Sequence, residues 1–120
     1  MNKKIFLVED DLFLGKLSRK KFELAGLNVQ FFDDGLEVAS QVKKENPAVI
    51  VLDLVMPKKN GFQVLEEMSR LKYQIPVVVA TNLGQAEDLK RVRELGAKDY
   101  FIKSEVSIKD LVNKVATIMA

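Results

Sequence analysis

Five short apolar runs alternate along the chain with longer segments in which apolar residues recur every third or fourth position. The short runs cover residues 4–8, 28–32, 48–53, 77–80 and 100–102. The longer segments cover residues 12–24, 36–44, 62–71, 85–95 and 107–119. Short continuous apolar runs are typical of buried strands, whereas the three-to-four spacing is typical of amphipathic helices. The pattern therefore predicts a strand followed by a helix, repeated five times.

Turn residues separate the predicted elements, and the linkers between them are short. Gly26 and Gly96 suit the left-handed cap that ends a helix, and Asn60-Gly61 is expected to form a turn. Alternating strands and helices of this length indicate one α/β domain over residues 1–120 with right-handed crossovers. Five parallel strands suit a flavodoxin-like three-layer sandwich of strand order 2-1-3-4-5, whose switch point lies between the first and third strands.

The helical spacing also predicts which side chains face the sheet. In the first helix the stripe near one face consists of Leu14, Leu17, Lys21 and Leu24. The corresponding residues of the second, third and fifth helices are Val38, Ala39 and Val42; Val64, Leu65, Met68 and Leu71; and Ile108, Leu111, Val112 and Val115. Gly15 lies within the first helix, where glycine is a weak helix former.

The composition narrows the chemistry that such a domain can carry. The 120 residues include no cysteine and no histidine, which excludes a thiolate nucleophile, a disulfide, an imidazole metal ligand and Ser-His-Asp catalysis. A net charge of +2 is weak evidence against direct nucleic-acid binding. No apolar run approaches the length of a membrane span or a signal-peptide core, so we expect a cytoplasmic protein.

Polar side chains stand where four of the predicted strands end. Glu9 and Asp10 follow the first strand, Asp53 ends the third, Thr81 ends the fourth and Lys103 follows the fifth. Taken singly, each has a structural explanation, because acids can cap helices or begin turns and a lysine can be solvated. In an open parallel sheet, however, these strand ends share one edge beside the switch point, where ligands bind. Their joint placement favours a functional site.

The residue types at these strand ends indicate phosphoryl chemistry. Clustered carboxylates repel one another unless a divalent cation lies among them. Their oxygens suit magnesium, or manganese in its place, with Asp10 and Asp53 supplying two ligands and a loop carbonyl a third. A carboxylate oxygen of Asp53 can then attack the phosphorus of a donor and form an aspartyl phosphate. Lys103 can neutralise one phosphoryl oxygen while Thr81 hydrogen-bonds another.

Four stretches of the chain, in this order and spacing, resemble the response-regulator receiver domains of two-component signalling. They are LVEDD at residues 7–11, LDLVMP at 52–57 with Gly61 beyond it, VAT at 79–81 and GAKDYFIK at 96–103. The resemblance covers the whole chain. It implies that Asp53 accepts a phosphoryl group from a histidine kinase, a phosphotransfer protein or a small phosphodonor.

The resemblance also implies roles for the neighbours of the phosphoacceptor. Asp10 is then a direct magnesium ligand, Glu9 holds the waters of the metal, and the backbone carbonyl of Val55 is the third protein ligand. Thr81 and Lys103 bind the phosphoryl group.

Tyr100 matches the switch aromatic of the family, which turns inward as Thr81 moves toward the phosphate. The surface of the fourth helix, fifth strand and fifth helix then changes and is read by a downstream effector protein or output domain, in a monomer or a phosphorylation-dependent dimer. An equally good explanation of Tyr100 is a half-buried strand aromatic that spans core and solvent.

Three positions depart from the family pattern. Ser104 follows Lys103 where a proline is usual, so the geometry of that peptide bond and the reach of Lys103 are open questions. Asn82 is larger than the small residue that often follows the switch hydroxyl. Val55 and Leu83 border the water that attacks the phosphoryl group, and neither can orient it. We therefore hypothesise slow self-dephosphorylation.

Other classes of protein fit the sequence less well. An interaction module that is never phosphorylated would not need the intact acid cluster, Thr81 and Lys103. A phosphatase with an aspartate nucleophile typically has a second acid two residues later, where Val55 stands here. A flavin-binding protein would need a phosphate-binding loop after the first strand, where three acids stand instead. We expect a phosphoryl acceptor and not a conventional enzyme.

Overall fold

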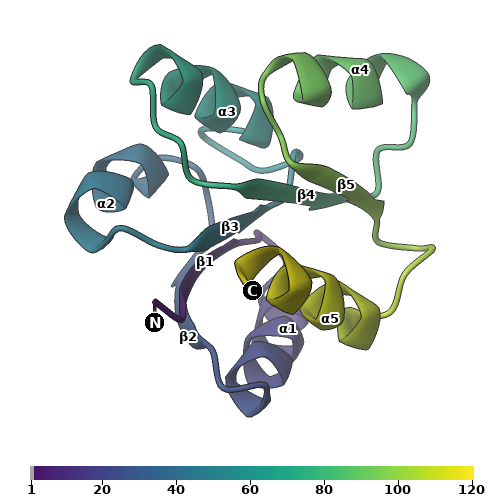
Figure 1. Cartoon of the computed structure of the whole chain (residues 1–120). Helices are drawn as coiled ribbons and strands as arrows, with labels where there is room; N and C mark the ends of the chain where they lie inside the picture. The colour runs from purple at the N-terminus through teal and green to yellow at the C-terminus, as the bar shows by residue number, and fades with distance from the viewer. Residues whose placement is uncertain (1) are drawn as a thin grey trace.

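Strands and helices alternate along the whole of the computed structural model, which describes residues 2–120 (Figure 1). The strands are β1 (Lys4–Val8), β2 (Asn28–Phe32), β3 (Val49–Leu52), β4 (Val77–Thr81) and β5 (Asp99–Ile102). The helices are α1 (Leu12–Leu24), α2 (Val38–Glu45), α3 (Gly61–Arg70), α4 (Ala86–Glu94) and α5 (Ile108–Met119). The prediction of five strand–helix repeats is confirmed.

The five strands form one parallel sheet in the order β2-β1-β3-β4-β5, as predicted. Helices α1 and α5 cover one face, and α2, α3 and α4 cover the other, which makes three layers (Figure 1). Because the chain goes from β1 outward to β2 and then returns to β3 on the other side, the switch point lies between β1 and β3. This is the flavodoxin-like arrangement, in which ligands bind at the carboxyl ends of the strands.

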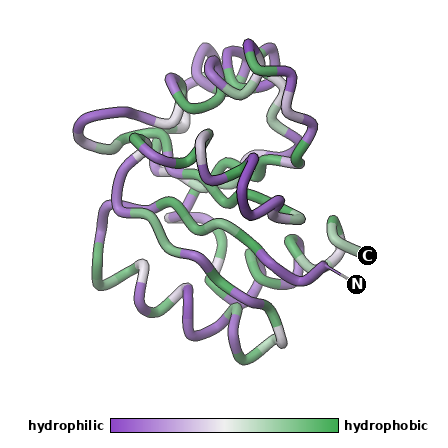
Figure 2. Tube along the Cα trace, turned by 90° about the vertical axis from the view of Figure 1, so that its left-hand side faces the viewer, coloured by the Kyte–Doolittle hydropathy of each residue, from purple (hydrophilic) through white to green (hydrophobic). Residues whose placement is uncertain are grey.

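The central strands are buried on both faces. Every residue of β3 and β4 is buried, and separate apolar clusters fill the two spaces between sheet and helices. The outer helices alternate between hydrophilic and hydrophobic positions (Figure 2), as amphipathic helices do when they cover a sheet. No helix within residues 2–120 is long and apolar enough to cross a membrane.

The buried face of α1 differs from the predicted stripe. Leu17 is 41% exposed and Leu24 74% exposed, while the buried residues are Gly15, Ser18 and Phe22. A Cβ atom on residue 15 would lie 2.5 Å from the ring of Phe31, so the bare glycine allows α1 to lie directly on β2. The prediction was wrong because it ranked residues by hydrophobicity, whereas close approach of a helix to a sheet selects small residues.

Helix α3 also differs from its prediction at both ends. It begins at Gly61, because the side chain of Asn60 accepts the N–H of Gln63 and the side chain of Gln63 accepts the N–H of Asn60. This reciprocal capping box explains why Asn60 starts a helix and does not simply form a turn. At the other end, Leu71 is 46% exposed and lies outside the buried face, which consists of the predicted Val64, Leu65 and Met68 together with Gly61 and Phe62.

The start of α3 is fixed against the end of β3 by Gly61. Its N–H donates to the carbonyl of Leu54 at 3.0 Å. A Cβ atom on this residue would lie 2.2 Å from the carbonyl oxygen of Asp53 and 2.8 Å from the Cα of Leu54. Both obstacles are backbone atoms that cannot rotate away, so only glycine fits.

We predict that Gly61→Ala lowers the free energy of unfolding by about 1–3 kcal/mol, the usual cost of overpacking, and displaces the backbone of Asp53. Gly84→Ala is the matched control, because its Cβ would meet only the end of the Ile102 side chain at an ordinary 3.6 Å. Chemical denaturation of the two variants measures the difference. Equal stabilities would show that the contact between α3 and β3 is not tight.

Candidate functional site

The carboxyl ends of β1, β3, β4 and β5 meet at one edge of the sheet. Backbone hydrogen bonds hold them in line: the N–H of Asp53 donates to Val8 at 3.0 Å, and the N–H of Lys103 donates to Thr81 at 2.8 Å. Glu9 directly follows β1, at the same edge. Strand register thereby brings together residues that are up to 94 positions apart in the sequence.

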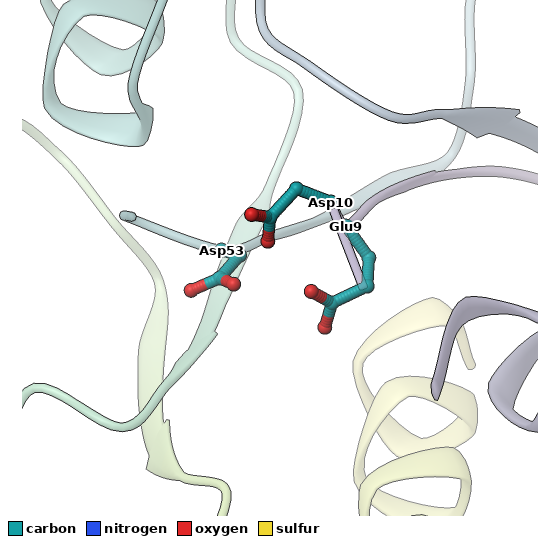
Figure 3. Close-up of side chains that lie close together, drawn as sticks. All are labelled: Glu9, Asp10 and Asp53. Atoms are coloured by element: carbon teal, nitrogen blue, oxygen red, sulfur yellow. The ribbon is translucent and has the colours of Figure 1, made fainter. Parts of the chain in front are cut away.

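Three carboxyl groups gather at this edge (Figure 3). Glu9 and Asp10 come from the end of β1, Asp53 from the end of β3, and one oxygen of each lies within 4.8 Å of the others. Glu9 and Asp53 are buried, whereas Asp10 is exposed. Negative charges at this separation disfavour one another, so a nearby positive charge is needed for the three carboxyl groups to be ionised together.

Lys103 supplies positive charge to two of the three acids. Its ammonium donates to Oε1 of Glu9 and, at 2.9 Å, to Oδ2 of Asp53. The other oxygen of Asp53, Oδ1, accepts the N–H of Leu54 at 2.7 Å. Peptide bonds throughout the described residues are trans, including Lys103–Ser104, and the lysine reaches the acids with serine in the place of proline.

The surroundings raise the pKa of both Glu9 and Lys103. Burial raises the pKa of Glu9 from its usual 4.5 to about 7, and the hydrogen bond and charge of Lys103 offset only part of this rise. Burial alone would lower the pKa of Lys103, but its hydrogen bonds to Glu9 and Asp53 outweigh burial and leave that pKa raised. The lysine therefore stays charged, while Glu9 takes up a proton at a higher pH than an ordinary glutamate does.

Two further predicted residues, Thr81 and Tyr100, are connected through the backbone of Leu83. Thr81 is fully buried, and its hydroxyl accepts the N–H of Leu83 at 3.3 Å. Tyr100 is half-buried, and its hydroxyl donates to the carbonyl of Leu83. Burial, followed by the charge of Asp88, raises the pKa of the Tyr100 phenol. Sequence reasoning missed this connection, because a contact to backbone atoms leaves no signal in the side chain of Leu83.

An open crevice of about 420 Å³ adjoins the carboxylates. Its lining consists of Glu9, Asp10, Asp11, Leu14, Asp53, Val55, Thr81, Asn82, Leu83 and Lys103. Val55 is 57% exposed here. The lining thus includes every predicted site residue except Tyr100, whose hydroxyl contacts the lining residue Leu83.

The donor set of the crevice fits a hard divalent cation. The carboxylate oxygens of Glu9, Asp10 and Asp53 converge, and the set contains neither sulfur nor imidazole. Oxygen-only sites of this kind suit magnesium, which also retains several waters. The third acid of the run, Asp11, has a structural role instead: its side chain accepts the N–H of Leu14 and caps α1.

Comparisons with known proteins identify the family that has this fold. A family model described as response regulator receiver domain matches residues 5–116. The chain therefore belongs to the response regulator receiver domain family. The transcriptional regulatory protein CpxR of Klebsiella pneumoniae is 36% identical over 116 residues, which make up 97% of this chain and 49% of that protein.

Solved receiver domains have the same fold. The Francisella response regulator 1452 receiver domain superposes with a TM-score of 0.90 at 27% identity, covering 98% of this chain and 97% of that one. The BeF3-activated N-terminal receiver domain of Klebsiella pneumoniae RstA superposes with a TM-score of 0.88 at 26% identity and covers 97% of each chain. The chain spans about half the length of the curated relatives that it matches.

The raised pKa of Glu9 predicts a pH dependence of stability when divalent metal is removed by a chelator. The folded chain holds the Glu9 proton more tightly than the unfolded chain does, so raising the pH from 4.5 to 7 costs stability. Between about pH 5 and pH 7.5, the free energy of unfolding should fall by about 1–3 kcal/mol more in the wild type than in Glu9→Gln. Denaturant titrations at both pH values measure this. Parallel pH dependences in the two proteins would mean that Glu9 is ionised throughout.

Proposed function

We propose that this chain is the phosphoacceptor domain of a two-component signalling system and takes up a phosphoryl group on Asp53. The observation that carries the proposal is the setting of the Asp53 carboxylate. It is buried at the switch point, one of its oxygens is held by a backbone N–H, and the other contacts an ammonium at 2.9 Å. A carboxylate fixed in this way beside two further acids is oriented to attack one phosphorus atom of a bound donor.

We assign the metal site to the same cluster. Asp10, Asp53 and the backbone carbonyl of Val55 would hold Mg²⁺ directly, and Glu9 would hold its waters. When bound, the ion neutralises the negative charge of the carboxylates and of the transferring phosphoryl group. The all-oxygen donor set supports this assignment, and manganese can take the place of magnesium.

The residues of the crevice then account for the transfer. An oxygen of Asp53 forms a bond to phosphorus as the bond from phosphorus to the donor's histidine nitrogen, or to a small donor's oxygen, breaks. Lys103 remains beside Asp53 and neutralises a phosphoryl oxygen. The hydroxyl of Thr81 turns from the N–H of Leu83 and donates to another phosphoryl oxygen. The product is an aspartyl phosphate.

This function makes the domain a switch and not a conventional enzyme. Its donor is a histidine kinase or a phosphotransfer protein. Thr81 and Tyr100 both contact Leu83. Movement of the Thr81 hydroxyl therefore changes the position of the Tyr100 side chain, and with it the surface of α4, β5 and α5. We assign the reading of that surface to an effector protein or an output domain, since the relatives are transcriptional regulators of about twice this length.

The central prediction concerns the acceptor residue. Incubation with a small phosphodonor and Mg²⁺ should add one phosphoryl group per chain, and Asp53→Asn or a chelator should abolish the addition. Asp33→Asn is the matched control, since Asp33 is exposed and lies outside the crevice. Intact-protein mass spectrometry measures the product. Addition that persists in Asp53→Asn would refute the assignment, and no addition to the wild type would favour an unphosphorylated interaction module.

A second prediction concerns the lifetime of the aspartyl phosphate. Val55 is exposed beside the crevice and has no polar atom with which to orient an attacking water. Val55→Asn should therefore shorten the half-life of the phosphoryl group several-fold, whereas Val55→Ala should leave it nearly unchanged. The decay of phosphoprotein after removal of the donor measures both. An unchanged half-life in Val55→Asn would contradict the hypothesis of slow self-dephosphorylation.

A further inference from the structure

One arginine joins α4 to α3 on the outside of the molecule. The guanidinium carbon of Arg91 lies 4.1 Å from the centre of the Phe62 ring. Its Nη2 atom donates to Oε1 of Glu66 at 2.9 Å. Phe62 and Glu66 are four residues apart and therefore share one face of α3. The flat guanidinium lies over the ring while its edge reaches the carboxylate, and we call this three-residue arrangement the Arg91 clasp.

On the α3 side, the Arg91 clasp includes Phe62, whose neighbour in the chain contacts the backbone of the phosphoacceptor. Phe62 directly follows Gly61, which packs closely against the carbonyl of Asp53 and donates a hydrogen bond to the carbonyl of Leu54. Phe62 itself is only 9% exposed and belongs to the apolar cluster on that face of the sheet. The start of α3 is therefore in direct backbone contact with the Asp53 loop, and the Phe62 ring belongs to the next residue.

On the α4 side, few other contacts hold the helix in place. Val92 is its only buried residue, whereas α3 buries five. The loop that leads into α4 contains Leu83, the residue that Thr81 and Tyr100 contact. With so little burial of its own, the position of α4 depends strongly on the Arg91 clasp.

We propose that Arg91 is a positioning residue that couples α4 to the phosphoacceptor loop by clasping Phe62 and Glu66. The coupling to Asp53 rests on the proposed function, whereas the anchoring of α4 does not. The ion pair contributes little because both partners are about half exposed, so the stacking on Phe62 is the main contribution. A lysine has no flat face with which to replace that stacking.

The anchoring is tested by amide hydrogen exchange of the purified chain. Arg91→Ala should speed exchange in residues 86–94 by about two- to fivefold, the effect expected for one exposed cation–π contact. Arg93→Ala is the matched control, because it removes the same charge from the same helix and Arg93 pairs with no acid within residues 2–120. Arg91→Lys and Phe62→Leu should each reproduce most of the Arg91→Ala effect, and combining Arg91→Ala with Phe62→Leu should add little.

The coupling is tested by repeating the measurement with Mg²⁺ and beryllofluoride, an analogue of the phosphoryl group. The exchange of residues 86–94 should respond in the wild type and in Arg93→Ala. The response should be clearly smaller in Arg91→Ala, where only the route through Leu83 remains. Binding of the analogue, followed separately by mass spectrometry under native conditions, should be retained in all three.

Several results would overturn the inference. The anchoring is contradicted if Arg91→Ala matches Arg93→Ala in both measurements, or if it speeds exchange equally across the sheet, which would indicate general destabilisation. A full response of α4 in Arg91→Ala would refute the coupling. A wild type that binds no beryllofluoride would instead contradict the proposed function, and the exchange of the analogue-free proteins would then decide whether the Arg91 clasp holds α4.

Discussion

The ammonium of Lys103 lies between two buried carboxylates that are far apart in the sequence, and the form of the crevice depends on this contact. Burial makes each charge costly, so removal of the lysine would leave Glu9 and Asp53 facing each other without compensation. The pair forms only if β1, β3 and β5 end at the same height. Strand register thus decides whether Glu9, Asp53 and Lys103 form one site or merely follow three separate strands.

Backbone contacts also connect this crevice to α3 and to the loop that precedes α4. Gly61 holds the start of α3 against Asp53, and the carbonyl and N–H of Leu83 bind Tyr100 and Thr81. Both routes lead to α4, one through its preceding loop and the other through the Arg91 clasp. A helix that buries a single residue is well suited to such a position, because small changes in its few contacts shift its equilibrium.

Much of the fold and of the site could be predicted from the sequence, because both follow from periodicity. Alternating strand and helix patterns gave the sheet order, and that order placed Glu9, Asp53 and Lys103 at one edge. The buried face of α1 could not be predicted in this way, since Gly15 and Ser18 are buried for their size and not for their hydrophobicity. Contacts to the backbone of Leu83, and the alignment of Arg91 over Phe62, depend on how elements lie in space. The spacing of residues within a single helix or strand therefore does not predict these contacts.

The most direct test of the account is to locate the phosphoryl group chemically. After incubation with a small phosphodonor and Mg²⁺, borohydride converts an aspartyl phosphate to homoserine, which peptide mapping assigns to a single residue. We expect conversion at Asp53 alone. One oxygen of Asp53 is held by the N–H of Leu54 and the other contacts Lys103, whereas burial raises the pKa of Glu9, the other buried acid, to about 7 and favours its protonated, non-nucleophilic form. Conversion at Asp10 or Glu9 would contradict the account, and so would conversion spread over several acids.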